Sequence, residues 1–225
     1  LDYHRFVRER LKVLAERIKE HRPGMDYRVF TDSAPVFERS LATLAGLGFI
    51  GKNTFLISKK AGLHTLIGTI FTNEEVLYND SVVKEGCGRC TRCIDACPSG
   101  ALAAPFRLDA RRCISYHTIE SESEDYKNSF TCDGHRYIFG CEICLNACPW
   151  SSRGDTTSWG EFAPLSDPNG RGVTSYTAEE WLEMDEEFFK AVFSKSPLSR
   201  AGLVKMKHNV QNILNNEKDE MAHRG

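Results

Sequence analysis

Nine cysteines stand out among the 225 residues because most of them gather at the spacings of metal ligands. The first group reads Cys87-Gly-Arg-Cys90-Thr-Arg-Cys93-Ile-Asp-Ala-Cys97-Pro98. A compact run of this kind, with a proline after its last cysteine, is typical of 4Fe–4S cluster binding. Structural zinc sites instead use paired C-x2-C hooks that are separated by a longer gap. The run therefore indicates an iron–sulfur cluster in preference to zinc.

A second run follows later in the chain and reads Cys141-Glu-Ile-Cys144-Leu-Asn-Ala-Cys148-Pro149. Its first cysteine is missing, because Ile138 stands at the position where the pattern requires one. Cys113 is the best substitute for that ligand, and Cys132 competes with it for the same place. If Cys132 is not a ligand, we expect it to be a free thiol on a loop.

The two runs predict which thiols share a cluster. In bacterial ferredoxins the fourth cysteine of each run binds the cluster of the other run. Crossing the fourth ligands in this way predicts a first cluster held by Cys87, Cys90, Cys93 and Cys148. The second cluster is then held by Cys97, Cys113, Cys141 and Cys144. Two clusters in series can deliver two electrons one at a time, which suits both a reductase and a plain electron carrier.

Ahead of the cysteines, the hydrophobic spacing alternates between the periods of helices and strands. The expected helices cover residues 1–21 and 36–45, and the expected β segments cover residues 27–31, 54–57 and 64–72. Asp32 directly follows the first strand, and Gly62 marks a turn between the last two segments. This alternation predicts an α/β layer that leads directly into the cluster module.

After Pro149 the composition changes. Residues 151–172 are rich in Ser, Thr, Gly and Asp and are expected to form a long connecting loop. Thr177-Ala-Glu-Glu180 is a capping-box start for a helix. Further helices are expected from about Phe188 and from about Leu203 to Leu214. We therefore predict three parts, which cover residues 1–82, 83–165 and 166–225.

Charge and hydropathy exclude some partners. The net charge of −2 provides no global basic field for nucleic acid, so any such contact must be a local patch. No apolar run is long enough to span a membrane, and the start at Leu1 lacks the pattern of a signal peptide. We expect a cytoplasmic protein without a membrane partner, and an N-terminal portion that precedes Leu1.

Gly46-Leu-Gly48-Phe-Ile-Gly51 matches the dinucleotide-binding fingerprint letter for letter. That motif needs a strand before the glycines and a helix after them, whereas here the expected order is reversed. Nucleotide binding is therefore disfavoured. We interpret these glycines as the end of a helix or as a close backbone approach to another flat ligand.

Five short segments together resemble the epoxyqueuosine reductase family. They are Thr31-Asp-Ser-Ala-Pro-Val36, Ala45-Gly-Leu-Gly-Phe-Ile-Gly-Lys-Asn-Thr54, Cys113-Ile-Ser-Tyr-His-Thr-Ile-Glu120, Phe139-Gly-Cys141 and Cys148-Pro-Trp150. The resemblance runs from about Tyr3 to Trp150, and Ser196-Pro-Leu-Ser-Arg-Ala-Gly-Leu203 in the tail also fits. Together these segments are far more specific than the cysteines alone.

The resemblance implies a cobalamin-dependent enzyme with two 4Fe–4S clusters. Such enzymes reduce epoxyqueuosine to queuosine at the wobble position of tRNA, the last step in making that base. The implied fold is an α/β cobalamin-binding domain, present here only in part, followed by a ferredoxin-like domain and a short helical tail. The chain resembles the shorter members, which lack a C-terminal helical-repeat domain.

The resemblance also assigns roles to particular residues. Asp32 matches the proton donor of the family, although an aspartate before a helical run is also a common helix cap. Residues that the resemblance places against the corrin are Lys52, Asn53, Thr54, Ser115, Thr118 and Glu142. Each of these side chains could equally make local hydrogen bonds.

The implied partners are tRNA and a reductant protein such as flavodoxin or ferredoxin, and we expect a monomer. Two basic groups are candidates for phosphate contacts, although both could be solvated surface. They are Arg107, Arg111 and Arg112, and Lys205, Lys207 and His208. Two other functions stay open: a corrinoid iron–sulfur reductase of a small molecule, and a two-cluster electron carrier with an accessory domain.

Overall fold

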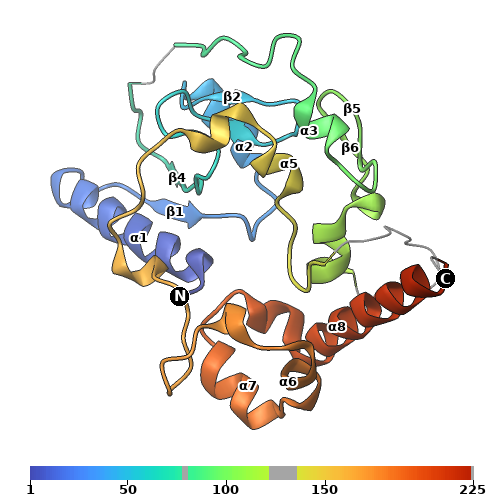
Figure 1. Ribbon diagram of the computed structural model, residues 1–225. Coiled ribbons are helices and arrows are strands. Elements are labelled where there is room, and N and C mark those ends of the chain that lie inside the picture. The colour runs from blue at the N-terminus through green and yellow to red at the C-terminus, as the bar shows by residue number, and fades with distance from the viewer. Residues whose placement is uncertain (78–80, 122–135, 224–225) are drawn as a thin grey trace.

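The computed structural model describes residues 1–77, 81–121 and 136–223, with side chains described up to residue 216. Three parts follow one another along the chain (Figure 1). An N-terminal α/β part comes first, a module that carries the cysteine runs comes second, and a helical tail closes the chain. Cys132 lies outside the described residues, so its competition with Cys113 is not decided.

The N-terminal part is built on one long helix and a pair of strands. Helix α1 (Tyr3–His21) begins at Asp2, whose side chain accepts a hydrogen bond from the backbone N–H of His4. Strand β1 (Tyr27–Phe30) pairs antiparallel with β4 (Thr69–Thr72), and α1 contacts both strands. The predicted helix and first strand are confirmed.

The apolar residues of α1 are not all buried. Phe6 and Ala15 are buried, whereas Leu14 and Ile18 are 50% and 40% exposed. The buried face of α1 is therefore narrower than the spacing of its apolar residues suggested.

Helix α2 (Glu38–Leu44) is followed by a short hairpin of β2 (Phe49–Ile50) and β3 (Leu56–Ile57). This order, with a helix before the glycines and a strand after them, is the one that disfavoured a dinucleotide site. Gly48 is explained by packing within the hairpin, because a Cβ at this position would overlap the Ile57 carbonyl oxygen. No flat ligand is needed to account for it.

The cysteine module contains a short helix within each of its two cysteine runs. Helix α3 (Arg92–Asp95) lies within the first cysteine run, α5 (Ile143–Asn146) lies within the second, and the two helices are in contact. Between them lie an antiparallel pair, β5 (Leu102–Ala104) with β6 (Arg107–Leu108), and the turns η1 (Ala110–Arg112) and η2 (Tyr116–Glu120). The turn η3 (Pro149–Ser152) ends the module.

The tail has its own hydrophobic core. It consists of α6 (Ala178–Glu183), α7 (Glu186–Phe193) and α8 (Leu198–His223), which is kinked at Gly202. The capping box at Thr177 is confirmed, and α7 begins two residues earlier than predicted. The backbone of α8 is non-helical at Gly202, so its second stretch begins at Leu203, where a helix was predicted. Buried core residues are Trp181, Met184, Phe189, Val192, Phe193, Leu203, Met206 and Val210.

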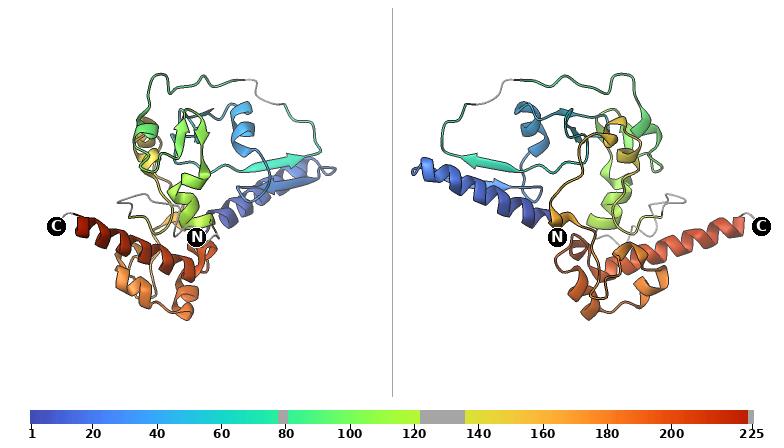
Figure 2. Two further views of the ribbon diagram at one scale, coloured as in Figure 1. Left: turned by 90° about the vertical axis from the view of Figure 1, so that its right-hand side faces the viewer. Right: turned by 60° about the vertical axis from the view of Figure 1, so that its left-hand side comes forward.

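The three parts are packed together, although the division at residues 82 and 165 stays a prediction. Residues 153–165 return to the N-terminal helix, where the ring of Phe6 lies 4.8 Å from that of Trp159 and 5.0 Å from that of Phe162. The short 3-10 helix η4 (Gly160–Phe162) interrupts the loop predicted at residues 151–172, and η5 (Val173–Ser175) directly follows that loop. In Figure 2, α8 projects from the helical tail, and it contacts η2 of the cysteine module. Within the described residues, no helix combines the length and hydropathy that a membrane crossing requires.

Candidate functional site

The eight cysteines within the described ranges are all free thiols, so they are available as ligands. Four of them, Cys87, Cys90, Cys93 and Cys148, line one cavity of about 240 Å³. The first three come from the first run and the last from the second run. The structure therefore brings together the crossed set that the two runs predicted.

The other four thiols form a neighbouring group. Burial, with smaller contributions from Cys141, Cys97 and Cys113, raises the pKa of Cys144 to about 12. Helix α3 carries Cys93 of the first group and helix α5 carries Cys144 of the second. These two helices are in contact, so the two cysteine runs lie side by side.

The backbone around the first group is held by two oppositely charged side chains. The Lys52 ammonium donates to the carbonyl oxygens of Gly88 at 2.6 Å and Cys90 at 2.9 Å. The Glu85 carboxylate accepts from the backbone N–H groups of Cys87 and Gly88. Four thiols that line one cavity, on a backbone fixed in this way, are a donor set that fits a 4Fe–4S cluster.

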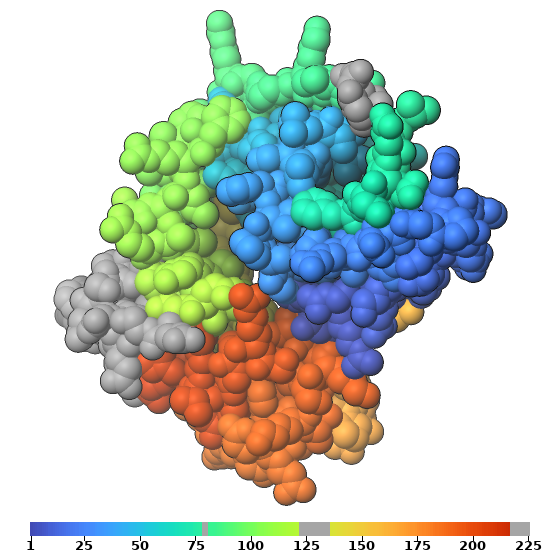
Figure 3. Space-filling model, turned by 180° about the vertical axis from the view of Figure 1, so that it is seen from behind, coloured from blue at the N-terminus to red at the C-terminus, as the bar shows by residue number. Residues whose placement is uncertain are grey.

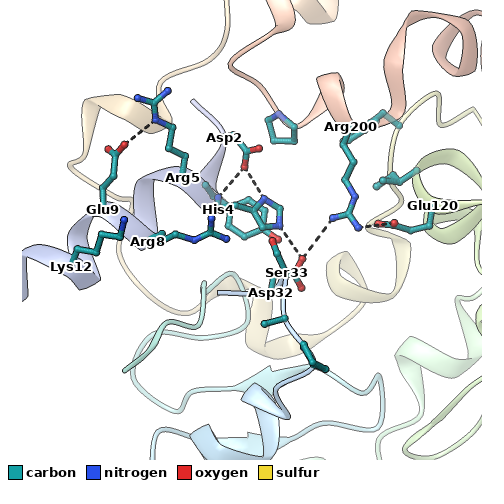
Figure 4. A pocket seen from close by; sticks show the side chains of 16 residues that line it. Asp2, His4, Arg5, Arg8, Glu9, Lys12, Asp32, Ser33, Glu120 and Arg200 are labelled. Atoms are coloured by element: carbon teal, nitrogen blue, oxygen red, sulfur yellow. Dashed lines mark hydrogen bonds and ion pairs between the residues drawn. The ribbon is translucent and has the colours of Figure 1, made fainter. Parts of the chain in front are cut away.

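A larger cavity, of about 1030 Å³, lies where the three parts of the chain meet. Figure 3 shows these parts adjoining on one face of the molecule, and Figure 4 shows the side chains that line the cavity. Its walls come from the start of α1, from Asp32 to Pro35, from Ile119, Glu120 and Phe139, and from Pro197 and Arg200. Its size suits a ligand at least as large as a typical cofactor.

Asp32 is the centre of a polar network in this cavity. His4 lies between two carboxylates, with Nε2 2.9 Å from Asp32 Oδ2 and Nδ1 2.7 Å from Asp2 Oδ1. On the other side, the Arg200 guanidinium lies 3.9 Å from Asp32 and 2.8 Å from Glu120. Figure 4 shows Asp32 between His4 and Arg200. A carboxylate with a histidine and an arginine at hand is equipped for proton transfer.

The backbone at Asp32 is strained, since its φ of 55° lies in the left-handed region that aspartate adopts only uncommonly. Such strain is typical of functional positions. Its carboxylate is directed to His4 and Arg200. The N-cap residue of α2 is Phe37, and no side chain forms a capping hydrogen bond there. The interpretation of Asp32 as a helix cap is therefore wrong.

Tyr3 belongs to the same cavity. Burial raises its pKa above the ordinary value of 10, and the negative charge of Asp32 and a hydrogen bond to it act in the same direction. The phenol therefore keeps its proton at neutral pH.

The residues that were expected to line the corrin do not gather around Asp32. Lys52 and Asn53 line the cavity of the first cysteine group, and the carbonyl oxygen of Thr54 accepts from Arg39. Ser115 is half-buried and Glu142 is exposed just before α5. None of these described residues lines the cavity of Asp32, and their contact with a corrin stays a prediction.

Thr118 is the sixth of those residues, and it is fully buried. Its hydroxyl donates to the Ile114 carbonyl at 2.9 Å and accepts from the Gly140 N–H at 3.0 Å. Its hydrogen bonds thus join η2 to the second cysteine run, and it does not line the cavity of Asp32.

The two predicted basic groups differ in exposure. Arg107, Arg111 and Arg112 are exposed, although Arg111 forms an ion pair with Asp109 at 3.0 Å. Lys205 is half-buried, and its ammonium donates to the Ser121 carbonyl. The first group is therefore the better placed for contact with phosphate.

Sequence reasoning gave no role to His4, Arg200 or Glu120, although Glu120 and Arg200 stand in segments that carried the family resemblance. Each reaches the site from a distant segment: His4 and Asp32 are 28 positions apart, and Arg200 and Glu120 are 80 apart. Only the Asp2-x-His4 spacing at the start of α1 carries a local signal, and that signal is for a helix cap.

Two sets of thiols beside a cavity with an aspartate at its centre define an iron–sulfur redox protein. Residues 86–151 match the family described as 4Fe-4S double cluster binding domain, and the chain contains such a domain. Residues 1–33 match the family described as Epoxyqueuosine reductase QueG, DUF1730.

Relatives of known name point to the same family. An epoxyqueuosine reductase of Pseudomonas aeruginosa is 41% identical over 206 residues, which are 89% of this chain and 54% of the relative. A crystal structure of epoxyqueuosine reductase with an epoxyqueuosine-modified tRNA stem loop has a TM-score of 0.80 at 28% identity, covering 98% of this chain and 56% of the other. A structure from Bacillus subtilis, with its catalytic aspartate loop swung out of the active site, has a TM-score of 0.76 at 26% identity over the same shares.

The chain belongs to the epoxyqueuosine reductase family. It spans about half the length of the Pseudomonas relative and of the solved structures.

Proposed function

We propose that this chain is the part of an epoxyqueuosine reductase that carries the catalytic acid and both 4Fe–4S clusters. The enzyme reduces epoxyqueuosine in tRNA to queuosine with the help of cobalamin. The observation that carries the proposal is the place of Asp32, in a large cavity directly beside the cluster module. A catalytic aspartate loop in the Bacillus subtilis relative supports the same role for the strained loop at Asp32.

Opening the epoxide and losing its oxygen as water takes two electrons and two protons. When bound, the clusters and the cobalt of the corrin supply the electrons. The protein supplies the protons and holds the reacting groups in place. Asp32 protonates the departing oxygen, and His4, whose Nε2 lies 2.9 Å from Asp32 Oδ2, returns a proton to Asp32. Arg200 holds the carboxylate from the other side and ties it to Glu120.

The size and the lining of the cavity are compatible with a large cofactor. It combines apolar walls from Ile119 and Phe139 with the polar network of Asp32. Lys52, Asn53, Thr54, Ser115, Thr118 and Glu142 remain the predicted corrin residues. For tRNA we favour the exposed arginines at 107 and 112. A flavodoxin or ferredoxin as electron donor, a monomeric state and a cytoplasmic location complete the proposal.

The test compares Asp32→Ala with the unchanged protein. The full open reading frame that contains this chain is expressed and reconstituted with iron, sulfide and cobalamin. It is then reacted with tRNA, and the nucleosides are analysed by mass spectrometry. We expect the unchanged protein to form queuosine and Asp32→Ala to be at least about 100-fold slower, because a positioned general acid contributes that much.

Asp26→Ala is the matched control, since Asp26 is an exposed aspartate just before β1, at the opposite end of that strand from Asp32. Its rate should match that of the unchanged protein. If Asp32→Ala keeps the full rate, Asp32 is not the acid. If the loaded, unchanged protein forms no queuosine, the substrate is wrong, and reduction of a small molecule becomes the leading function.

A further inference from the structure

Asn53, beside the first group of thiols, has a buried side-chain amide whose hydrogen bonding is incomplete. Its side chain is only 2% exposed and lines the same cavity as Cys87 and Cys90. Its Nδ2 atom is buried and has no hydrogen-bond partner among the described residues. Buried amide donors are nearly always paired, so a buried amide left alone at the wall of a ligand cavity indicates a partner within that cavity.

The orientation of this amide follows from its other atom. Asn53 Oδ1 accepts a hydrogen bond from the backbone N–H of Phe55 at 3.2 Å. The reverse orientation would set two donors against each other, so Nδ2 is the unpaired atom. Gly51 makes room for this arrangement, because a Cβ there would lie 2.7 Å from Oδ1 and 2.5 Å from Ile57 Cδ1.

A neighbouring donor already faces sulfur. The backbone N–H of Lys52 donates to Cys87 Sγ at 3.5 Å. Lys52 and Asn53 thus present two consecutive N–H donors to the wall of one cavity. Lys52 already donates to a sulfur atom. A cluster in that cavity would offer further sulfur atoms as acceptors of the same kind.

We propose that Asn53 donates an N–H···S hydrogen bond from Nδ2 to the first 4Fe–4S cluster and thereby raises its reduction potential. The reduced cluster carries one more negative charge, so hydrogen bonds to its sulfur atoms stabilise it more than the oxidised cluster. This role is independent of the corrin contact that the family resemblance implies for Asn53. It rests on the proposed assignment of Cys87, Cys90, Cys93 and Cys148 to one cluster.

The alternative is that Asn53 serves only the turn at Phe55. Asn53→Asp separates the two roles, because it keeps an oxygen for the Phe55 N–H and removes the donor. It also adds a negative charge, which by itself lowers the potential. Asn146→Asp supplies the control for charge: Asn146 is exposed on α5, between the ligands Cys144 and Cys148.

The experiment uses the reconstituted protein with asparagine labelled by ¹⁵N at its side-chain amide. Pulsed electron paramagnetic resonance of the electrochemically reduced cluster should detect a coupled ¹⁵N nucleus. We expect this coupling in the unchanged protein and in Asn146→Asp, and its loss in Asn53→Asp. The midpoint potential of that cluster should shift further to the negative in Asn53→Asp than in Asn146→Asp.

A reduced-cluster signal without ¹⁵N coupling in the unchanged protein would overturn the inference, even if Asn53→Asp assembled poorly. Equal shifts of potential in the two variants would also overturn it, because charge alone would then explain the effect. The readout needs neither tRNA nor corrin. Failure to form queuosine, which tests the proposed function, is therefore distinct from failure here.

Discussion

At the scale of single residues, the site depends on charges that hold one another in place. Asp32 is 55% exposed, and its carboxylate still has defined neighbours in His4 and Arg200. His4 is much less exposed, at 15%, and both of its ring nitrogens face carboxylates. The imidazole therefore fixes the position of the acid, and it can also hold a proton for it.

We predict that His4→Gln lowers the rate of queuosine formation while both clusters remain loaded. A hydrogen bond to a charged group is worth about 1.5–3 kcal/mol, so the expected loss is about 10- to 100-fold. The assay is single-turnover reduction followed by nucleoside mass analysis. His64→Gln is the control, because His64 is exposed and lies outside the cavity. A full rate in His4→Gln would show that Asp32 acts without it.

At the scale of elements, the start of α6 is stabilised by a reciprocal pair of caps. Thr177 accepts from the backbone of Glu180, and the Glu180 carboxylate accepts from the backbone of Thr177. Glu180 also receives two hydrogen bonds from Arg171. The hydrogen bonds from Arg171, together with the one from Thr177, lower the pKa of Glu180 to about 2.

This shift predicts how the tail responds to acid. The folded pKa lies below the ordinary value of 4.5, so the stabilisation is complete above pH 4.5 and is lost as the pH falls toward 2. Glu180→Gln should remove this part of the acid dependence and make the tail less stable near neutral pH. Hydrogen exchange of the α6 peptide, followed by mass spectrometry between pH 2 and 7, measures it.

Glu179→Gln is the matched control, since Glu179 is exposed in the same first turn and loses the same charge. If the two variants behave alike in acid, general charge on the helix explains the effect and the capping box does not.

At the scale of the whole molecule, α8 joins the tail to the cysteine module. Asn209 is 2% exposed, and its Nδ2 donates to the carbonyl oxygens of Thr118 at 3.0 Å and Ile138 at 2.8 Å. Thr118 belongs to η2, and Ile138 stands where the second run lacks its cysteine. One side chain thus ties α8 to both of these segments of the cysteine module, where α8 contacts η2.

Asn209→Ala should therefore lower the free energy of unfolding by about 2–4 kcal/mol, because it leaves two buried carbonyl groups without their donor. Chemical denaturation of the reconstituted protein measures this loss. Asn212→Ala is the control: its amide forms a hydrogen bond with His208 on the same helix, so we expect a change below about 1 kcal/mol. A similar loss in both variants would show that Asn209 does not join the two parts.

Much of the chemistry was predictable from the sequence, because it depends on local spacing. The two cysteine runs indicated the double cluster domain, and the crossed order of ligands predicted which thiols now lie in one cavity. The capping box at Thr177 and the strand before Asp32 follow from a few adjacent residues, so they too were visible without the fold.

The tertiary structure decided what stands around those residues. His4, Asp32 and Arg200 come from three separate parts of the chain, and no periodicity in the sequence connects them. The same holds for Asn53, because only packing shows that its buried side chain lines the cavity of the first group of thiols. Local spacing encodes ligands and helix ends, whereas a shared cavity forms only when distant segments pack, because burial and charge pairing depend on neighbours in space.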